Sequence, residues 1–188
     1  MIPGTSDPEA ASVPGDATEM ATRAAANRRT LEQVEREAAS WLTRDFAGAM
    51  LAIHPPDALP PRSAFDPVEV PKLLPHLILV TVERNPYRFL VKLTGQSMRD
   101  AIKTTLSGHY LQDFLETMPS MRFPIEDRMQ VCETGLAVYG LRQPRTQIAF
   151  DFARIEYLHM PFASDGYRVD RILSLFAYEG DNRSAFRR

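Results

Sequence analysis

Four histidines and one cysteine are the side chains best suited to metal binding or nucleophilic chemistry in this chain of 188 residues. The histidines, His54, His76, His109 and His159, are too far apart to form a metal-binding pair such as His-x3-His. Cys132 stands in the stretch MQVCETG, an apolar helical setting typical of an inert buried thiol. The sequence therefore predicts no metal site and no thiol catalyst, and we interpret His159, late in a predicted strand, as a packed side chain.

Other catalytic signatures are missing as well. The nine glycines are spread singly, so no phosphate-binding loop is formed, and there is no serine nucleophile elbow, catalytic carboxylate pair or zincin helix. Asp151, Arg154 and Glu156 alternate along DFARIEY, which we interpret as a solvated strand face with cross-strand ion pairs. We expect no enzymatic activity.

Composition sets the class of protein within which any site must be built. The length fits one domain plus extensions, and 44% hydrophobic residues suffice for a core. The net charge is -2 and the basic residues are scattered, so no nucleic-acid partner is expected. No secretory signal is recognisable, and the longest apolar run is well short of the roughly 20 residues of a membrane span. We therefore expect a cytoplasmic protein.

The N-terminal part of the chain divides into a tail and a helix. Residues 1–27 are rich in Pro, Gly, Ser, Ala and Asp, and we expect this tail to be disordered. From Thr30 to about Ile53, apolar residues recur at spacings of three and four and predict an amphipathic helix. The proline-rich stretch HPPDALPPR then forms a connector, so residues 28–60 are expected to hold the N-terminal helix and its connector.

Residues 61–180 carry the pattern of a mixed domain. In FDPVEVPKLLPHLILVTVE, Asp66 is spaced to cap a short helix that Pro75 ends, and the following strand is apolar on both parities. The turn RNPY joins it to RFLVKLTG as an antiparallel hairpin, in which Phe89, Val91 and Leu93 share one face. Short helices follow, ending on the capping residue Gly135, and three more strands complete the domain, the last two joined by the Asp-Gly turn of ASDGY.

The predicted fold class is therefore α+β. Five antiparallel strands form one sheet, helices are inserted between strands two and three, and the N-terminal helix flanks the other face. Residues 181–188 are expected to be a C-terminal tail.

This order resembles a PAS domain, and several motifs resemble the bacterial PAS_5 group in particular. The stretch from FDPVEV to KLTG is similar to the start of that group, as are LSGHYLQDF and HMPFASDGYRVDRIL to its later motifs. Trp41-Leu42 resembles the opening of the pattern, so the likeness covers about 41–178. Two departures concern the loop IKTTLSG and His109, which stands where the group carries Arg. The resemblance implies a sensory or regulatory fold without specifying a ligand.

Cofactors known from PAS domains are not expected here. His109, beside Tyr110, lies where PAS domains often present side chains to their cavity, but we regard it as an unlikely haem ligand. The Asn-Cys-Arg motif of the flavin-binding light sensors is missing, so flavin is equally unlikely. The cofactor, if there is one, is unknown.

A mixed apolar lining between the sheet and the inserted helices is the candidate ligand site, suited to a small apolar or amphipathic molecule. The same side chains would equally fill a packed core and leave no cavity. The candidate lining residues are Leu93, Met98, His109, Leu111, Phe114, Met129, Val138, Phe152 and Leu173.

The function expected from these observations is that of a stand-alone sensory or regulatory PAS module that binds a small ligand, an unidentified signalling protein, or both. The alternative is a ligand-free interaction scaffold with a filled core. The apolar stripe of the N-terminal helix is wider than one sheet face needs, which predicts a homodimer. Its candidate interface residues are Leu31, Val34, Trp41 and Leu42, with Trp41 as the anchor.

Overall fold

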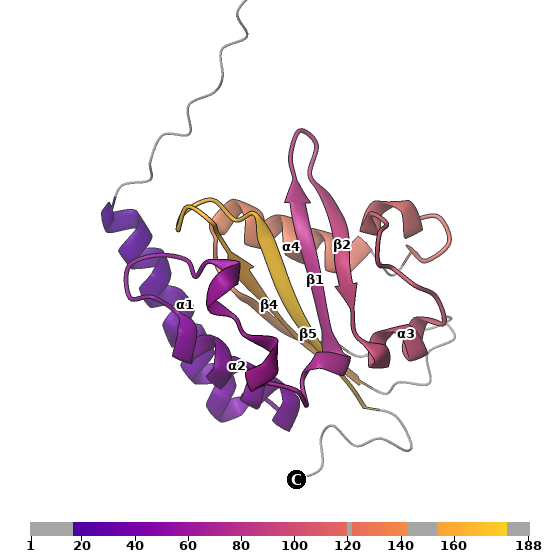
Figure 1. Ribbon diagram of the computed structural model, residues 1–188, viewed down its shortest axis with the longest axis horizontal. Helices are drawn as coiled ribbons and strands as arrows, with labels where there is room; N and C mark the ends of the chain where they lie inside the picture. The colour runs from indigo at the N-terminus through magenta and orange to yellow at the C-terminus, as the bar shows by residue number, and fades with distance from the viewer. Residues whose placement is uncertain (1–16, 120–121, 143–153, 180–188) are drawn as a thin grey trace, which may run out of the picture.

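The computed structural model describes residues 17–119, 122–142 and 154–179, which form one antiparallel sheet with helices on both faces (Figure 1). The strands are β1 (Leu77–Glu83), β2 (Arg88–Thr94), β3 (Val138–Arg142), β4 (Arg154–Phe162) and β5 (Arg171–Glu179), in the spatial order β2-β1-β5-β4-β3. The helices are α1 (Ala17–Glu37), α2 (Trp41–Ile53), α3 (Gln96–Ile102) and α4 (Arg122–Thr134), with four short 3-10 turns, η1 (Arg62–Ala64), η2 (Pro67–Glu69), η3 (Leu74–His76) and η4 (Leu111–Phe114).

This topology confirms the predicted fold class. The helices α3 and α4 and the turn η4 are inserted between β2 and β3 and cover one face of the sheet, while α1 and α2 cover the other (Figure 1). The strand β1 is apolar on both parities because Leu77 contributes to the core beneath α1 and α2, whereas Ile78 and Val80 contribute to the core on the α4 side. The chain therefore has the PAS-like arrangement that its sequence predicts.

Local sequence signals explain how the strands begin and turn. The side chain of Asp66 accepts a hydrogen bond from the amide of Val68 at 2.8 Å, so the predicted cap is present. The prolines divide the predicted helix into the separate turns η2 and η3. Both predicted hairpins form, and Gly166 in the second adopts a φ of 78°, which glycine reaches at little cost.

The expected disordered tail is wrong for residues 17–27, which form the first half of α1. Ala24 and Asn27 are completely buried, and the side chain of Asn27 joins α1 to the start of β3. Its Nδ2 donates to the carbonyl of Gly135 at 3.0 Å, and its Oδ1 accepts from the amide of Ala137 at 2.7 Å. The small residues that resemble tail composition here allow the helix to pack closely, with Ala24 completely buried. Residues 1–16 and 181–188, also expected to be tails, lie outside the described residues.

We expect deletion of residues 1–27 to lower the melting temperature by about 5 °C or more, because it removes the buried contacts of Ala24 and Asn27. Differential scanning calorimetry of the full chain, of a chain starting at Ala17 and of a chain starting at Arg28 measures this effect. Equal melting temperatures for the two shortened chains would show that the first half of α1 adds nothing to stability.

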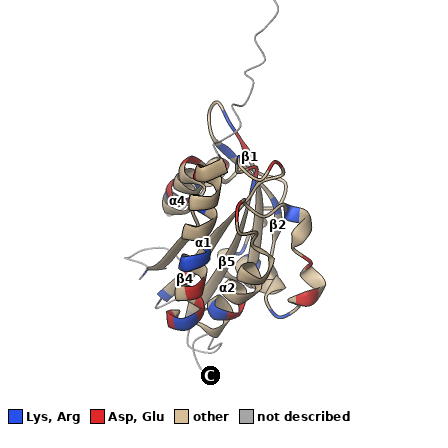
Figure 2. Ribbon diagram, turned by 90° about the vertical axis from the view of Figure 1, so that its left-hand side faces the viewer, with Lys and Arg blue, Asp and Glu red and all other residues tan. Residues whose placement is uncertain are grey.

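The predicted helix from Thr30 to Ile53 is two helices. The chain leaves α1 after Glu37, and Ser40 begins α2 as its N-cap, its hydroxyl accepting from the amide of Leu42 at 3.2 Å. Acidic and basic side chains are mixed along the outer surfaces of the two helices (Figure 2). Periodicity alone missed the break because the apolar stripe continues across it.

The expected dimer interface on this helix is also wrong for three of its residues. Leu31, Val34 and Leu42 are buried in the core between the two helices and their own sheet. Trp41 is partly buried against the same core. The stripe is wide because two packed helices each need an apolar face, so these residues leave no surface for a partner.

A β-bulge in β2 changes the face on which Leu93 lies. Leu79 pairs with Leu93, but the next residue, Val80, pairs with Val91, so Lys92 is an extra residue in β2. Side chains beyond the bulge therefore exchange faces. Phe89 and Val91 are buried on the α4 side, whereas Leu93 lies on the opposite face with 43% of its surface exposed.

Candidate functional site

Five of the nine candidate lining residues meet in the layer between the sheet and the inserted helices. They come from α3, η4, α4 and β3, and they contact one apolar cluster that also includes Val80, Phe89 and Phe176 of the sheet. These five residues are Met98, Leu111, Phe114, Met129 and Val138. These five residues therefore pack in one layer, and their role as a ligand lining stays a prediction.

The other candidates do not belong to this layer. Leu93 is on the opposite face because of the bulge, and Leu173 is there because it alternates with Ile172 and Ser174 along β5. His109 is exposed at the edge of β2, where its carbonyl accepts from the amide of Val91 and its ring meets Phe114 edge-on. Phe152 lies outside the described residues.

A buried arginine is the most unusual feature of the layer. Arg128 of α4 is only 1% exposed, and its Nη1 donates to the carbonyl of Pro124 at 2.9 Å. Burial lowers the pKa of its guanidinium to about 10, so the group stays charged at neutral pH. No carboxylate lies within ion-pair distance of it among the described residues, and its Nε has no hydrogen-bond partner. A buried charge without a counter-ion is costly, so its presence calls for a reason.

Two polar side chains of the sheet lie against this arginine. Arg128 Nη2 lies 3.0 Å from the hydroxyl of Ser174 on β5, and the same hydroxyl lies 2.8 Å from Nδ1 of His159 on β4. Ser174 and His159 are opposite each other in the β4–β5 pairing, and both are completely buried. Desolvation, together with the positive charge of Arg128, holds the pKa of His159 well below its ordinary value, so its ring is neutral. We call these three residues the buried polar cluster.

Aromatic rings surround the cluster. The ring of His159 lies 4.9 Å from that of Tyr157 and 5.6 Å from that of Phe176, between centroids. Phe176 in turn stacks on Tyr178, whose hydroxyl lies 2.9 Å from the sulfur of Met98. Burial raises the pKa of Tyr178, which therefore remains protonated. The cluster is thus a polar centre in an otherwise apolar and aromatic layer.

A second group of polar side chains lies around Tyr157, and within it the charges of Asp127 and Arg142 cancel. The hydroxyl of Tyr157 donates to Asp127 at 2.8 Å and accepts from Nε of Arg142 at 2.7 Å. Arg142 also pairs with both carboxylate oxygens of Asp127 at 3.1 Å. The charge of Asp127 also raises the pKa of Arg128 through space, but it is shared with Arg142 and forms no ion pair with Arg128.

Metal and thiol chemistry find no support in this layer. Within the described ranges, no three His, Cys, Asp or Glu side chains are grouped as metal ligands. Burial raises the pKa of Cys132 to about 12, so its thiol is protonated and unreactive at neutral pH. In addition, no helix in the described part of the chain is long and apolar enough to cross a bilayer.

Sequence reasoning missed Arg128 and Ser174 and took His159 for ordinary packing. A usable signal was present, because Arg128 stands three residues from Ile125 and three from Val131, on the buried stripe of α4. A cation on an apolar helical face is rare, so this position is recognisable from the sequence. Ser174 and His159 share the parity of the inward-facing Ile172 and Tyr157.

On the opposite face of the sheet, the side chain of Glu156 has a structural role. The sequence predicts a solvated strand face for Glu156, which is wrong, because Glu156 is completely buried beneath the start of α2. Its carboxylate accepts from the amides of Ala39 and Ser40 and from the hydroxyl of Thr43, each at 2.8 Å, and from the hydroxyl of Tyr139 at 2.7 Å. Glu156 therefore caps α2 from the sheet, where the helix dipole favours a negative charge.

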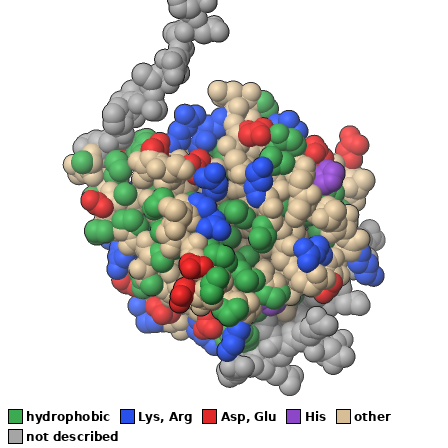
Figure 3. All heavy atoms as spheres, viewed as in Figure 1, with side chains coloured by type: hydrophobic (Ala, Val, Ile, Leu, Met, Phe, Trp, Pro, Cys, Tyr) green, Lys and Arg blue, Asp and Glu red, His purple; other side chains and the backbone are tan. Residues whose placement is uncertain are grey.

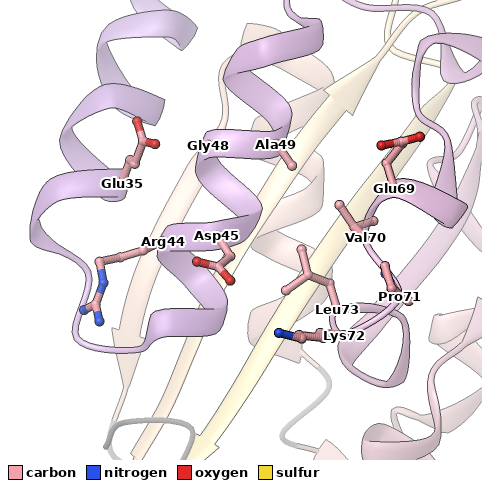
Figure 4. A pocket seen from close by; sticks show the side chains of 10 residues that line it. All are labelled: Glu35, Arg44, Asp45, Gly48, Ala49, Glu69, Val70, Pro71, Lys72 and Leu73. Atoms are coloured by element: carbon pink, nitrogen blue, oxygen red, sulfur yellow. The ribbon is translucent and has the colours of Figure 1, made fainter. Parts of the chain in front are cut away.

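The opposite face also has an open cleft of about 670 Å³ between α2 and the segment around η2 (Figure 4). Its charged lining residues have both signs, and Asp45 and Lys72 lie across from each other. Arg44 is engaged elsewhere, since its Nη1 donates to the carbonyl of Ala38 at 2.6 Å. A shallow cleft with mixed charge does not favour any one class of ligand.

Comparisons with known proteins add little to this geometry. No family model matches the chain, and no curated protein matches it. A solved structure described as an RNA-binding light-oxygen-voltage receptor is similar over 86% of this chain, with 14% sequence identity and a TM-score of 0.40. The match spans 59% of that structure's length. The class of protein therefore rests on the topology of this chain, which is that of an α+β protein with a PAS-like fold.

Proposed function

We propose that this chain is a sensory or regulatory module of the PAS type, which binds a small molecule between the sheet and the inserted helices. The buried polar cluster supports this proposal most directly, because the charged Arg128 meets only a carbonyl, a hydroxyl and the ring of Phe176 and has no carboxylate partner among the described residues. Perturbed and unpartnered buried groups are concentrated at functional sites. Membership of the PAS_5 group, suggested by the motifs of the sequence, forms part of this proposal.

The test is to look for a small molecule carried by the protein and for a variant that excludes it. We expect denaturation of the purified protein to release one small molecule, and mass spectrometry to detect it in near-stoichiometric amount. Met129→Trp fills the layer from α4 and should abolish that release while the protein remains folded. The ligand-free scaffold would be favoured if the purified protein releases no small molecule and the Met129→Trp variant unfolds. Overpacking a filled core costs roughly 1–3 kcal/mol of stability.

A second function, self-association, is favoured by the open part of the sheet. The helix α2 packs over β4 and β5, and α1 packs on α2, so that apart from the start of β1 at Leu77 the strands β1 and β2 have no covering helix on this face in the described part of the chain (Figure 1). Leu93 lies on this face, and hydrophobic side chains gather near the middle of the same view of the molecule (Figure 3). The predicted homodimer therefore remains a proposal, with its interface transferred from α1 to the β1–β2 face.

We expect Leu93→Glu to convert a dimer at tens of micromolar into a monomer, because it places a charge within the proposed apolar interface. Light scattering coupled to gel filtration measures the mass directly. Leu141→Glu is the matched control, since Leu141 on β3 is 45% exposed at the far edge of the sheet. A monomeric parent protein, or a dimer unaffected by Leu93→Glu, would contradict this interface.

A further inference from the structure

The hydrogen-bond directions of the buried polar cluster determine which protons are available. A guanidinium only donates, so Arg128 Nη2 donates to the oxygen of Ser174. The Ser174 oxygen can also accept from Nδ1 of His159, but its own proton and the lone pair on Nε2 would then both lack a partner, so we assign the hydroxyl proton to the hydrogen bond with Nδ1. A neutral imidazole that accepts at Nδ1 carries its proton on Nε2.

The cluster consequently has two donors and no acceptor for them. His159 Nε2 and Arg128 Nε are both buried and have no hydrogen-bond partner. Their residues are 0% and 1% exposed, so bulk water does not solvate them. An unsatisfied donor at such a position costs about 1–3 kcal/mol, and the guanidinium adds the cost of its charge. Both costs are relieved by one species, an anion with oxygen acceptors.

The charge of the surroundings limits how negative this anion is. Asp127 is paired with Arg142, His159 is neutral, and Tyr178 is protonated, so Arg128 contributes one positive charge that has no ion-pair partner among the described residues. A single negative charge balances it. A phosphate monoester, with a charge of roughly -1.5 to -2 at neutral pH, would leave negative charge buried.

The rest of the layer indicates the body of the ligand. Around the cluster the side chains are aromatic, aliphatic or thioether, and several on the α3, η4 and α4 side remain only partly buried. These partly buried residues include Ile102, Phe114, Leu115, Met118 and Met129. Such a surface suits an apolar group, and methionine side chains adapt to its shape.

We propose that the ligand is a monocarboxylate with an apolar body, whose carboxylate accepts hydrogen bonds from Arg128 and His159. This inference rests on the proposed function and specifies the chemical class of its ligand. The carboxylate would lie beside Ser174 and the apolar body toward α3 and η4. Because the cluster residues are 0–1% exposed, the side chains packed over them must move aside when the ligand binds.

Paired probes that differ only in charge test this inference. Calorimetric titration would compare benzoate with benzamide and octanoate with octanamide, using protein stripped of small molecules by unfolding and refolding. We expect at least one carboxylate to bind about tenfold or more tightly than its amide. Equal binding of a carboxylate and its amide would overturn the carboxylate assignment but leave the proposed function intact.

A variant separates the role of Arg128 in binding from a role in folding. Arg128→Met keeps the length of the side chain and removes its charge, and we expect it to abolish the preference for carboxylate. Its ligand-free form should melt no lower than the parent, because replacing an uncompensated buried charge by an apolar group is often neutral or stabilising. Arg88→Met is the matched control, since Arg88 lies over the ring of Tyr110 outside the layer and should leave binding unchanged.

The contrary outcomes are distinct from one another. The inference would be overturned if the Arg128→Met variant still prefers the carboxylate to its amide. It would also be overturned if the parent protein binds no carboxylate and Arg128→Met melts several degrees lower than the parent. If Arg128→Met does not fold, the comparison of carboxylate and amide on the parent protein still decides. Failure of all four probes, together with the absence of any small molecule in the purified protein, would overturn the proposed function itself.

Discussion

Replacing Glu156 by alanine is expected to lower the free energy of unfolding by about 3 kcal/mol or more. The carboxylate accepts four hydrogen bonds, and three of their donors, two amides and the hydroxyl of Thr43, belong to the turn and first residues of α2. Without it these donors remain buried with no acceptor, and α2 loses the negative charge at its N-terminus. Chemical denaturation followed by circular dichroism measures the loss.

Tyr139→Phe provides the matched control for this prediction. It removes one of the four hydrogen bonds to Glu156, and its ring is 37% exposed, so we expect a loss of only about 0.5–1.5 kcal/mol. Glu156→Gln should fall between the two variants, because it keeps one acceptor oxygen and removes the charge. A Glu156→Ala protein as stable as Tyr139→Phe would show that water replaces the carboxylate and that the cap is not structural.

Acidification is expected to weaken the fold steeply below pH 6.5, and His159 is the main histidine responsible. Its folded-state pKa lies well below the ordinary value of 6.5 because of burial and the nearby charges of Arg128 and Arg142. As the pH falls below about 6.5, His159 therefore becomes protonated in the unfolded chain while it stays neutral in the folded chain. Stability is fully present above that pH and falls by up to about 1.4 kcal/mol per pH unit below it, until the folded-state pKa is reached.

Denaturation curves between pH 7.5 and 5 measure this slope, and a His159→Gln variant isolates its origin. The groups that contact His159 are Tyr157, Phe176 and Ser174, and the charges that act on it are those of Arg128 and Arg142. Glutamine does not titrate, so the variant should lose most of the slope near pH 6. The burial-lowered pKa values of His54 and His76 act in the same direction and remain in both proteins. Parallel curves for parent and variant would contradict the assignment to His159.

Local patterns in the sequence were sufficient for the sheet. A strand that is apolar on both parities must be covered on both faces, and short turns such as RNPY and ASDGY allow only antiparallel neighbours. Once two strands precede the helices and three follow them, few topologies remain, and the order β2-β1-β5-β4-β3 is the PAS-like one. These features are predictable because they depend on neighbours in the chain.

The first half of α1 shows the limit of composition as a guide. Five of residues 17–27 are alanines, which have the highest helix propensity, but the segment has few large apolar side chains with which to bury surface on its own. Their helix is stable because Asn27 bonds to the segment around Gly135, more than a hundred positions away. Helix stability that comes from tertiary contacts does not appear in local propensity.

The candidate site was only half predictable from the sequence. The apolar residues Met98, Leu111, Phe114, Met129 and Val138 have the spacing of inward-facing positions, and they do share one layer. The bulge at Lys92, however, moves Leu93 to the other face, and a single extra residue in a strand has no signature in alternation. The lining could therefore be named by type, although its membership depended on register.

The buried polar cluster and the cap of α2 were decided by tertiary structure alone. Arg128, His159 and Ser174 come from α4, β4 and β5, and nothing in their spacing along the chain brings a cation, an imidazole and a hydroxyl together. Glu156 reads as a surface residue until the amides of Ala39 and Ser40 lie above it. The sequence pattern shows which faces of a helix or strand are apolar. The charge state and hydrogen-bond partners of a buried group depend instead on which distant segments pack around it.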